Sequence, residues 1–303
     1  MKRVPQIGWL ADGRRLHLQD GPIDLIVEGR GGAANVRAAC DAAVQRFTGL
    51  LDELCGELPL LRQAVDPARC ELQGAVARRM DAAVAPFALD HFITPMAAVA
   101  GAVAEEILGA MLQSAPLERA YVNNGGDIAL HLADGEHFTV GLAERPDAPD
   151  LMRTMIVHAD DPSRGVATSG RHGRSFSLGI ADAVTVLAAT ASQADAAATI
   201  IANAVDLPGH PAIVRCPAHD LQSDSDLGAR LVTRDVGELT GHEVEDALES
   251  GAACARKLLA AGLIDGAALR LRGETVLVSA RAIDTLRSGT SVHRGAMESA
   301  MHV

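Results

Sequence analysis

Three short segments of the sequence carry residue types that bind small ions, and the first runs from Gly165 to Ser177. It combines glycines, which expose backbone N–H groups, with hydroxyls and two arginines, a composition that suits a phosphate or pyrophosphate. An ordinary solvated loop between two strands is an equal alternative, because glycine, serine and arginine are common in such loops. The residues expected to contact an anion are Thr168, Ser169, Gly170, Arg171, Arg174 and Ser175.

The second segment begins a predicted helix, Ser192 to Ala204, that carries Asp195 and Thr199. These two residues are four positions apart and share one helix face, where they offer oxygen ligands to a Mg²⁺ ion that retains several waters. Ser192 followed by Asp195 is also close to a capping box, and an acidic residue in the first turn suits the helix dipole. Taken alone, capping is the favoured interpretation, because caps are far more common than metal sites.

The third segment consists of Asn123, Asn124, Gly125, Gly126 and Asp127. Its adjacent glycines would let a ligand lie against bare backbone, with amide and carboxylate side chains at the rim. A tight hairpin turn is the favoured alternative for this segment. No catalytic residue is assigned, because the sequence has no Ser-His-Asp order, nucleophile elbow, Walker loop or dinucleotide fingerprint.

The first half of the chain is predicted to supply a hairpin and several helices. Asp20-Gly21 suits a tight turn between strands at Arg14–Gln19 and Ile23–Val27. Apolar residues recur at helical spacing from Ala33 to about Leu61, which predicts one long or two consecutive amphipathic helices.

Thr94-Pro95 suits the start of a further helix, Met96 to Leu112, with Thr94 as its cap. Alanines and Gly101 give this helix a thin surface, so we expect another element to pack very close to it.

The second half is predicted to be rich in antiparallel strands. Arg119 to Leu142 has the pattern of a three-strand meander, and a linker at Arg145–Asp150 leads to a strand near Met152–His158. Later elements are expected at Ala183–Ala188, Ser192–Ala204, Pro211–Arg215, Leu231–Val236, Gly241–Ala261 and a hairpin around Gly273. The pattern predicts an α+β fold with antiparallel or mixed sheets flanked by helices: one compact domain, 1–281, and a polar tail, 282–303.

Composition and charge limit the classes of partner. The net charge is −12 and no segment is dense in Lys or Arg, which disfavours nucleic acid and anionic membrane surfaces as partners. Five cysteines without a C-x-x-C pair indicate buried, reduced thiols, and no stretch is expected to be long and apolar enough to span a membrane. We therefore expect a cytoplasmic protein with a small phosphorylated ligand as partner; a homo-oligomer remains open.

The three segments occur in the order and rough spacing of motifs in the ApbE superfamily, which the chain resembles over residues 90 to 210. Asn124-Gly125-Gly126-Asp127-Ile128 looks like the family's N-x-G-G-D/N-I turn, and Ala167-Thr168-Ser169-Gly170 looks like its T-S-G segment. Ala183-Val-Thr-Val, followed by Ala194-Asp-Ala-Ala-Ala-Thr199, is similar to S-V-T-V … A-D-A-L-A-T.

Known enzymes of that superfamily are Mg²⁺-dependent FAD:protein FMN transferases, in which the Asp and Thr of the last motif bind the metal. The resemblance thus implies an ApbE-like fold, with Mg²⁺ at Asp195 and Thr199 and FAD as the ligand. It also places Thr94–Gly101 where the family has a helix whose backbone contributes to the metal and flavin site.

The sequence departs from the family pattern in three places. Arg174–Asp182 stands where the enzymes carry an H-I-I-D-P-x-T-G signature, and small residues near Ala98–Gly101 replace a lysine-glycine-tyrosine. The lipoprotein signal of exported members is absent from this sequence. The chain therefore looks like a member of a short cytoplasmic branch of the superfamily.

The leading hypothesis from the sequence is a protein that binds a phosphorylated, flavin-type ligand with Mg²⁺, with FMN transfer from FAD as its candidate reaction. Two alternatives stay open. One is a cofactor-biosynthesis enzyme acting on another phosphorylated heterocycle, such as a pterin-type one-carbon carrier. The other is a non-catalytic ligand-binding or assembly protein.

Overall fold

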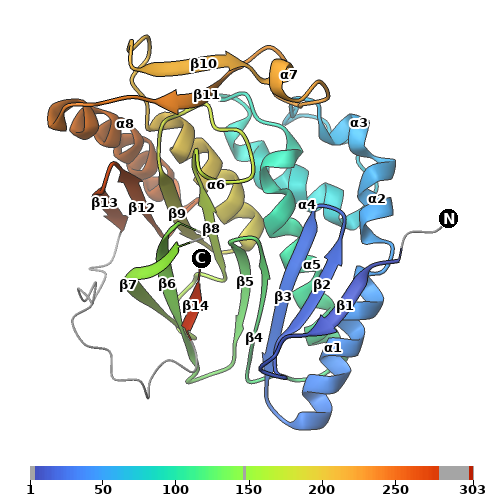
Figure 1. Cartoon of the computed structure of the whole chain (residues 1–303). Coiled ribbons are helices and arrows are strands. Elements are labelled where there is room, and N and C mark those ends of the chain that lie inside the picture. The colour runs from blue at the N-terminus through green and yellow to red at the C-terminus, as the bar shows by residue number, and fades with distance from the viewer. Residues whose placement is uncertain (1–3, 146–147, 280–299, 303) are drawn as a thin grey trace.

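The computed structural model describes residues 4–145, 148–279 and 300–302, and a nine-stranded antiparallel sheet lies at its centre (Figure 1). Every second side chain of the strand Ile23–Arg30 is buried, as expected for a strand with one covered face. The strands, in spatial order, are β1 (Gln6–Trp9), β2 (Leu16–Asp20), β3 (Ile23–Arg30), β4 (Arg119–Asn124), β5 (Asp127–Leu132), β8 (Gly165–Ser169), β9 (Ala183–Ala188), β12 (Gly266–Leu271) and β13 (Glu274–Ser279).

Four helices pack on one face of this sheet, and a fifth packs on two of those helices (Figure 1). The alternating side chains on that face, such as Val122 and Ala167, join the helices in the larger hydrophobic core, which accounts for the α+β fold in one compact domain. The four are α1 (Ala33–Phe47), α5 (Val99–Ser114), α6 (Ala191–Ala204) and α8 (Gly241–Ala260), and α4 (Ala75–Val84) packs on α5 and α6.

The opposite face of the sheet carries a second hydrophobic cluster, in which Tyr121, Ile128 and Val166 contact Phe138 and Val157. The last two residues belong to β6 (His137–Arg145) and β7 (Ala148–His158), which form a separate sheet with β14 (Ala300–His302).

The predicted meander is therefore wrong in its third strand. β4 and β5 pair as expected, but β5 pairs next with β8 and not with β6. The expected linker at Arg145–Asp150 is the end of a β6–β7 hairpin, of which 146–147 lie outside the described residues. The predicted tail, 282–303, also lies outside them, except for the residues of β14.

The expected burial of the cysteines is wrong for most of them. Cys40 is buried, but Cys55 and Cys70 are exposed, and Cys216 and Cys254 are partly exposed.

The predicted helical segment from Ala33 to Leu61 is three helices. Gly49 adopts a positive φ of 87°, which ends the first helical run, and α2 (Leu50–Gly56) and α3 (Leu58–Leu61) follow. The predicted helix from Met96 begins as a 3₁₀ turn, η2 (Pro95–Ala98), before α5. Thr94 does not cap it; its hydroxyl donates to Asp226 at 2.5 Å.

A ribbon of β10 (Ile213–Pro217), α7 (Ala218–Leu221) and β11 (Leu231–Val236) lies across one end of the molecule (Figure 1). Thr233 N–H donates to Ser177 O at 2.9 Å. The Arg230 guanidinium lies 3.1 Å from the centre of the Phe92 ring. The ribbon thus connects the loop before β9 to the loop before η2.

Pro95–Ser114 is long and apolar enough, by length and composition, to cross a membrane, contrary to the expectation from the sequence. Half of that window is buried, and α5 packs against α1, α6 and the strands β4 and β5. An apolar helix at the centre of a folded domain has the same composition, because it is covered on most sides.

The start of α6 is held between α5 and β8 with no space for side chains. A Cβ atom built on Gly101 would lie less than 3.0 Å from the carbonyl of Ala191 and 2.7 Å from Ser192 N. A Cβ on Gly165 would lie equally close to the carbonyl of Thr190. The close approach predicted for the thin helix is thus confirmed, and its partner is the first turn of α6.

Candidate functional site

Two carboxylates from distant parts of the sequence meet at the candidate site. Asp127 begins β5, directly after the β4–β5 turn, and Asp195 lies in the second turn of α6. Asp127 Oδ1 accepts a hydrogen bond of 3.3 Å from Thr168 N, at the end of β8. Asp195 Oδ2 accepts one of 3.0 Å from Gly101 N, in the first turn of α5. The site therefore draws on two strands and two helices.

The surroundings of both carboxyl groups favour the protonated form. Asp127 and Asp195 are partly buried residues whose carboxyl groups are surrounded by protein. Loss of water around these groups raises the pKa of both. For Asp127, the charge of Asp195 raises the pKa further, and Thr168 N–H and Arg174 oppose the rise. Desolvation raises the pKa of Asp195 to about 7, against the hydrogen bonds from Gly101 and Ala100.

Two carboxylates in this arrangement repel each other when both are ionised. A cation between or beside them would relieve that repulsion.

Asp195 does not cap its own helix, so the capping interpretation favoured from the sequence is wrong. The N-cap of α6 is Thr190, whose hydroxyl oxygen accepts a hydrogen bond of 3.3 Å from Gln193 N. Asp195 instead binds the unpaired N–H groups at the start of α5, a different helix. Its partner Gly101 lies 94 positions away in the sequence.

The β4–β5 turn is a tight hairpin turn and also borders the site. Gly125 and Gly126 both have positive φ angles, 66° and 113°, and Asn123 Oδ1 accepts from Gly126 N at 2.8 Å. Asn124 is buried, and its side-chain amide donates to Ala100 O at 3.2 Å, which ties the turn to the start of α5. The tight hairpin turn favoured from the sequence is thus confirmed, and ligand binding at this segment stays a prediction.

Arg174 is the cation of the predicted anion-binding loop that lies nearest the carboxylates. Its guanidinium covers Gly125, where a Cβ atom would overlap it, and its charge lowers the pKa of Asp127. Arg174 Nη1 also donates to Pro22 O at 3.4 Å, while the residue as a whole is exposed. Its guanidinium therefore lies at the β4–β5 turn, close enough to Asp127 to act on its pKa.

Arg171 is bound to another carboxylate in the same loop. Its Nε and Nη2 atoms lie 2.9 and 2.7 Å from Asp182 Oδ1, which His172 Nε2 approaches at 3.2 Å. Asp182 Oδ2 accepts from Arg272 N at 2.6 Å, so Asp182 joins the loop to the β12–β13 turn. Arg171 therefore holds the loop in place, and its charge is largely balanced by Asp182.

The remaining predicted contacts divide between the site and the scaffold. Thr168 faces the site through its backbone N–H, while its hydroxyl is 2.8 Å from that of Thr185. Gly170 is buried with a φ of 154°, and a Cβ atom there would lie 3.0 Å from the carbonyl carbon of Asp182. Ser169 is partly exposed and Ser175 is exposed.

The donor set fits a Mg²⁺ ion that takes only part of its ligands from the protein. No group of three or more His, Cys, Asp or Glu residues that could hold a metal is found among the described residues. Mg²⁺ is commonly held by one or two carboxylates and completes its shell with water and phosphate oxygens. Asp195, with Thr199 one turn further along the partly exposed face of α6, and the neighbouring Asp127 provide that kind of site.

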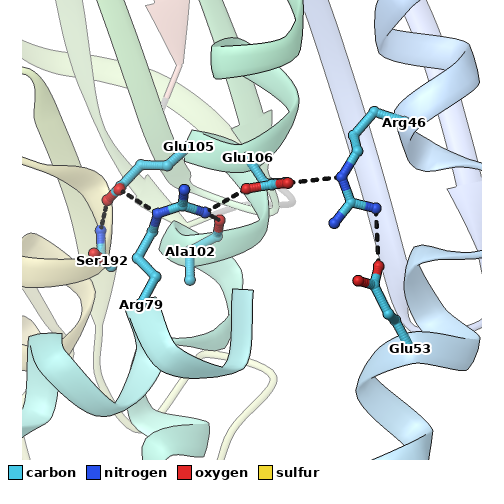
Figure 2. A network of polar contacts seen from close by, with 7 residues as sticks. All are labelled: Arg46, Glu53, Arg79, Ala102, Glu105, Glu106 and Ser192. Carbon is cyan, nitrogen blue, oxygen red and sulfur yellow. Dashed lines mark hydrogen bonds and ion pairs between the residues drawn. The ribbon is translucent and has the colours of Figure 1, made fainter. Parts of the chain in front are cut away.

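Sequence reasoning missed Glu105, an acidic residue of α5 that also lies near Asp195 and raises its pKa. Glu105 Oε1 accepts from Ser192 N at 2.6 Å, and its other oxygen is 3.2 Å from Arg79 Nε (Figure 2). The signal was present in the sequence: Glu105-Glu106 interrupts a run of small apolar residues, and acids in a core helix need partners.

Comparisons with known proteins agree with the motifs. A family model described as AbpE bacteria matches residues 7–277. The UPF0280 protein of Methanopyrus kandleri is 40% identical over 164 residues, which cover 53% of this chain and 62% of that protein. The UPF0280 protein of Methanocella arvoryzae is 34% identical over 168 residues, or 55% and 65% of the two chains.

The chain thus spans less than two thirds of the length of these curated relatives. Among solved structures, the chain is similar to the apo form of the flavinyl transferase ApbE of Pseudomonas stutzeri, with 14% sequence identity. Its TM-score is 0.37, with coverage of 95% of this chain and 98% of that one.

Proposed function

Because the chain belongs to the family described as AbpE bacteria, within the ApbE-like superfamily, we propose that it binds a flavin nucleotide, FAD, together with Mg²⁺. The match over residues 7–277 confirms the resemblance inferred from the three motifs. The proposal concerns binding, because the segment 174–182 lacks the His-Asp-Pro element of the flavin-transferring enzymes.

One observation carries this proposal: the paired carboxylates Asp127 and Asp195 lie beside the Arg174 guanidinium and the Thr168 backbone. A pyrophosphate has negative oxygens that need both a metal ion and hydrogen-bond donors. The two carboxylates attract the ion, and the arginine offers its donors to the phosphate oxygens.

The chain's own residues have separate roles in this proposal. Asp195 and Thr199 would hold Mg²⁺, which when bound supplies positive charge against the pyrophosphate. Arg174 would contact the phosphates from the side of the β4–β5 turn. Gly126 has open space where a Cβ atom would stand, so a flat ring could lie against the backbone there, next to the Arg174 guanidinium that covers Gly125.

The test is a titration of purified protein with FAD, followed by visible absorbance and flavin fluorescence, in Mg²⁺ and in EDTA. We expect binding that requires Mg²⁺ and is lost in Asp195→Ala. A melting curve of the variant controls for folding. A parallel titration with FMN, and displacement of bound FAD by ADP, show which half of the nucleotide is recognised.

Two results would contradict the proposal. Failure of FAD to bind, with Mg²⁺-dependent protection by another phosphorylated heterocycle, would reject the flavin and favour a different cofactor substrate. Indifference to all of these compounds, with and without Mg²⁺, would reject small phosphorylated ligands altogether.

Arg174→Ala is expected to weaken FAD binding about tenfold, because a charge-assisted hydrogen bond to phosphate is lost. The melting temperature should change little, because Arg174 is exposed. Arg14→Ala is the matched control: Arg14 is exposed near the β1–β2 connection and its removal changes the net charge equally. Equal weakening in both variants would mean that only the overall charge matters, and that Arg174 makes no direct contact.

A further inference from the structure

Helices α5 and α6 begin side by side, and each supplies a carboxylate to the first turn of the other. Asp195 of α6 accepts from Gly101 N of α5 at 3.0 Å. Glu105 of α5 accepts from Ser192 N of α6 at 2.6 Å. First-turn N–H groups have no partner within their own helix, and the positive end of the helix dipole favours an anion there. The two hydrogen bonds are therefore reciprocal caps, closed over the contact between Gly101 and Ala191.

Glu105 is in turn held by Arg79, which projects from α4 (Figure 2). Arg79 Nε lies 3.2 Å from Glu105 Oε2, and Arg79 Nη1 donates to Glu106 Oε2 at 2.8 Å and to Ala102 O at 3.3 Å. The side chains of Glu105 and Arg79 are 19% and 32% exposed, so solvent screens this pair only partly. Arg79 therefore fixes the direction in which Glu105 points.

The same network continues outward to a residue that does not touch Glu105. Arg46 Nε is 2.6 Å from Glu106 Oε1, and Arg46 Nη1 is 2.9 Å from Glu53 Oε2 (Figure 2). Arg46 and Arg79 are thus both part-buried arginines that each bridge two carboxylates. Of the two, only Arg79 contacts Glu105, which binds the start of α6.

We propose that Glu105 and Arg79 are positioning residues for Asp195: they fix the first turn of α6 against α5, and so fix the carboxylate that would hold the metal. This inference rests on the proposed function of the site for its consequence on binding. The positioning of Asp195 by Glu105 depends only on two hydrogen bonds, Ser192 N to Glu105 and Gly101 N to Asp195.

The experiment compares Glu105→Ala, Glu105→Gln, Arg79→Gln and the control Arg46→Gln with the unaltered chain. Three quantities are measured: amide hydrogen exchange of Ala100 and Gly101, the Kd for FAD in Mg²⁺, and the melting temperature. Glu105→Ala should speed exchange of both amides, which it does not contact, and raise the Kd roughly tenfold or more, as loss of residues that orient metal ligands does.

Glu105→Gln keeps an oxygen acceptor for Ser192 N and should bind FAD within about threefold of the unaltered chain. Arg79→Gln leaves Glu105 in place but removes the ion pair that holds it. This variant should also speed exchange of the Ala100 and Gly101 amides and raise the Kd for FAD, both by less than Glu105→Ala. Arg46→Gln should lower the melting temperature to a similar extent as Arg79→Gln, with exchange at Ala100 and Gly101 and the Kd unchanged.

Equal changes in exchange and Kd for Arg46→Gln and Arg79→Gln would overturn the proposal, because the network would then be a general stabiliser. Unchanged exchange at Gly101 in Glu105→Ala would overturn it as well. If the unaltered chain binds no FAD in Mg²⁺, the proposed function fails, and the exchange comparison still decides whether Glu105 positions Asp195.

Discussion

Gly101→Ala is expected to destabilise the protein by about 3 kcal/mol or more, because the added methyl group has no space. Its Cβ would lie less than 3.0 Å from the Ala191 carbonyl and 2.7 Å from Ser192 N, and both are backbone groups that cannot rotate away. The first turn of α6 would have to move away from α5. The hydrogen bonds Asp195–Gly101 and Glu105–Ser192 would lengthen together.

Gly109→Ala, in the same helix, is the matched control. Nothing lies within 4 Å of a Cβ built on Gly109, so alanine there should raise stability by about 1 kcal/mol through its higher helix propensity. The measurement is urea unfolding of both variants, followed by circular dichroism. Similar stabilities for the two variants would mean that α6 shifts without cost and that the close contact is not a fixed feature of the site.

The small residues of α5 are the clearest case in which the sequence predicted a feature of the site. Alanine and glycine in Met96–Ala104 predicted a close neighbour, and Gly101 has one in the first turn of α6. The Asp20-Gly21 hairpin was also confirmed, because β2 and β3 pair through a turn with Gly21 at a φ of 57°. Features of this kind depend on local conformation and residue size, which single-sequence patterns describe well.

The neighbour of β5 could not be predicted in the same way. The turn signal Asp134-Gly135 favoured a hairpin from β5 to β6, and that local signal is real, because Glu136 N donates to Ala133 O at 3.0 Å. The edge of β5 is nevertheless taken by β8, through Ile128–Val166 and Ala129–Gly165. The choice between two strands of similar apolar pattern is made by long-range packing, and no local turn rule contains that information.

The role of Asp195 was misjudged for a similar reason. An acid near a helix start is usually paired with its own first turn, and the alternative partner Gly101 is 94 residues away in the sequence. Only the order of the three motifs, as in the ApbE superfamily, indicated that Asp127 and Asp195 belong to one site. The contacts of Arg79 and Glu105 had no such motif, so they appear only in the folded chain.

Asp195→Asn is expected to raise stability at pH 8 without divalent cations, while it removes the response to Mg²⁺. The pKa of Asp195 is about 7 in the folded protein against an ordinary value of 3.8, so the folded state binds the extra proton between these pH values. Stability contributed by this group is therefore fully present below pH 3.8 and is lost as the pH rises through about 7. Asparagine carries no charge at any pH, and its amide oxygen can still accept from Gly101 N.

The gain at pH 8 should be on the order of 2 kcal/mol, seen as a melting temperature a few degrees higher in EDTA, and it should vanish near pH 4. Mg²⁺ should raise the melting temperature of the unaltered chain and leave the variant unchanged, because a ligand stabilises only the state that binds it. Asp134→Asn, in the exposed β5–β6 turn, removes the same charge and should show neither effect. A lower melting temperature for Asp195→Asn at pH 8 in EDTA would mean that the ionised carboxylate stabilises the folded protein. Cation binding would then not be needed to explain an acidic residue beside Asp127.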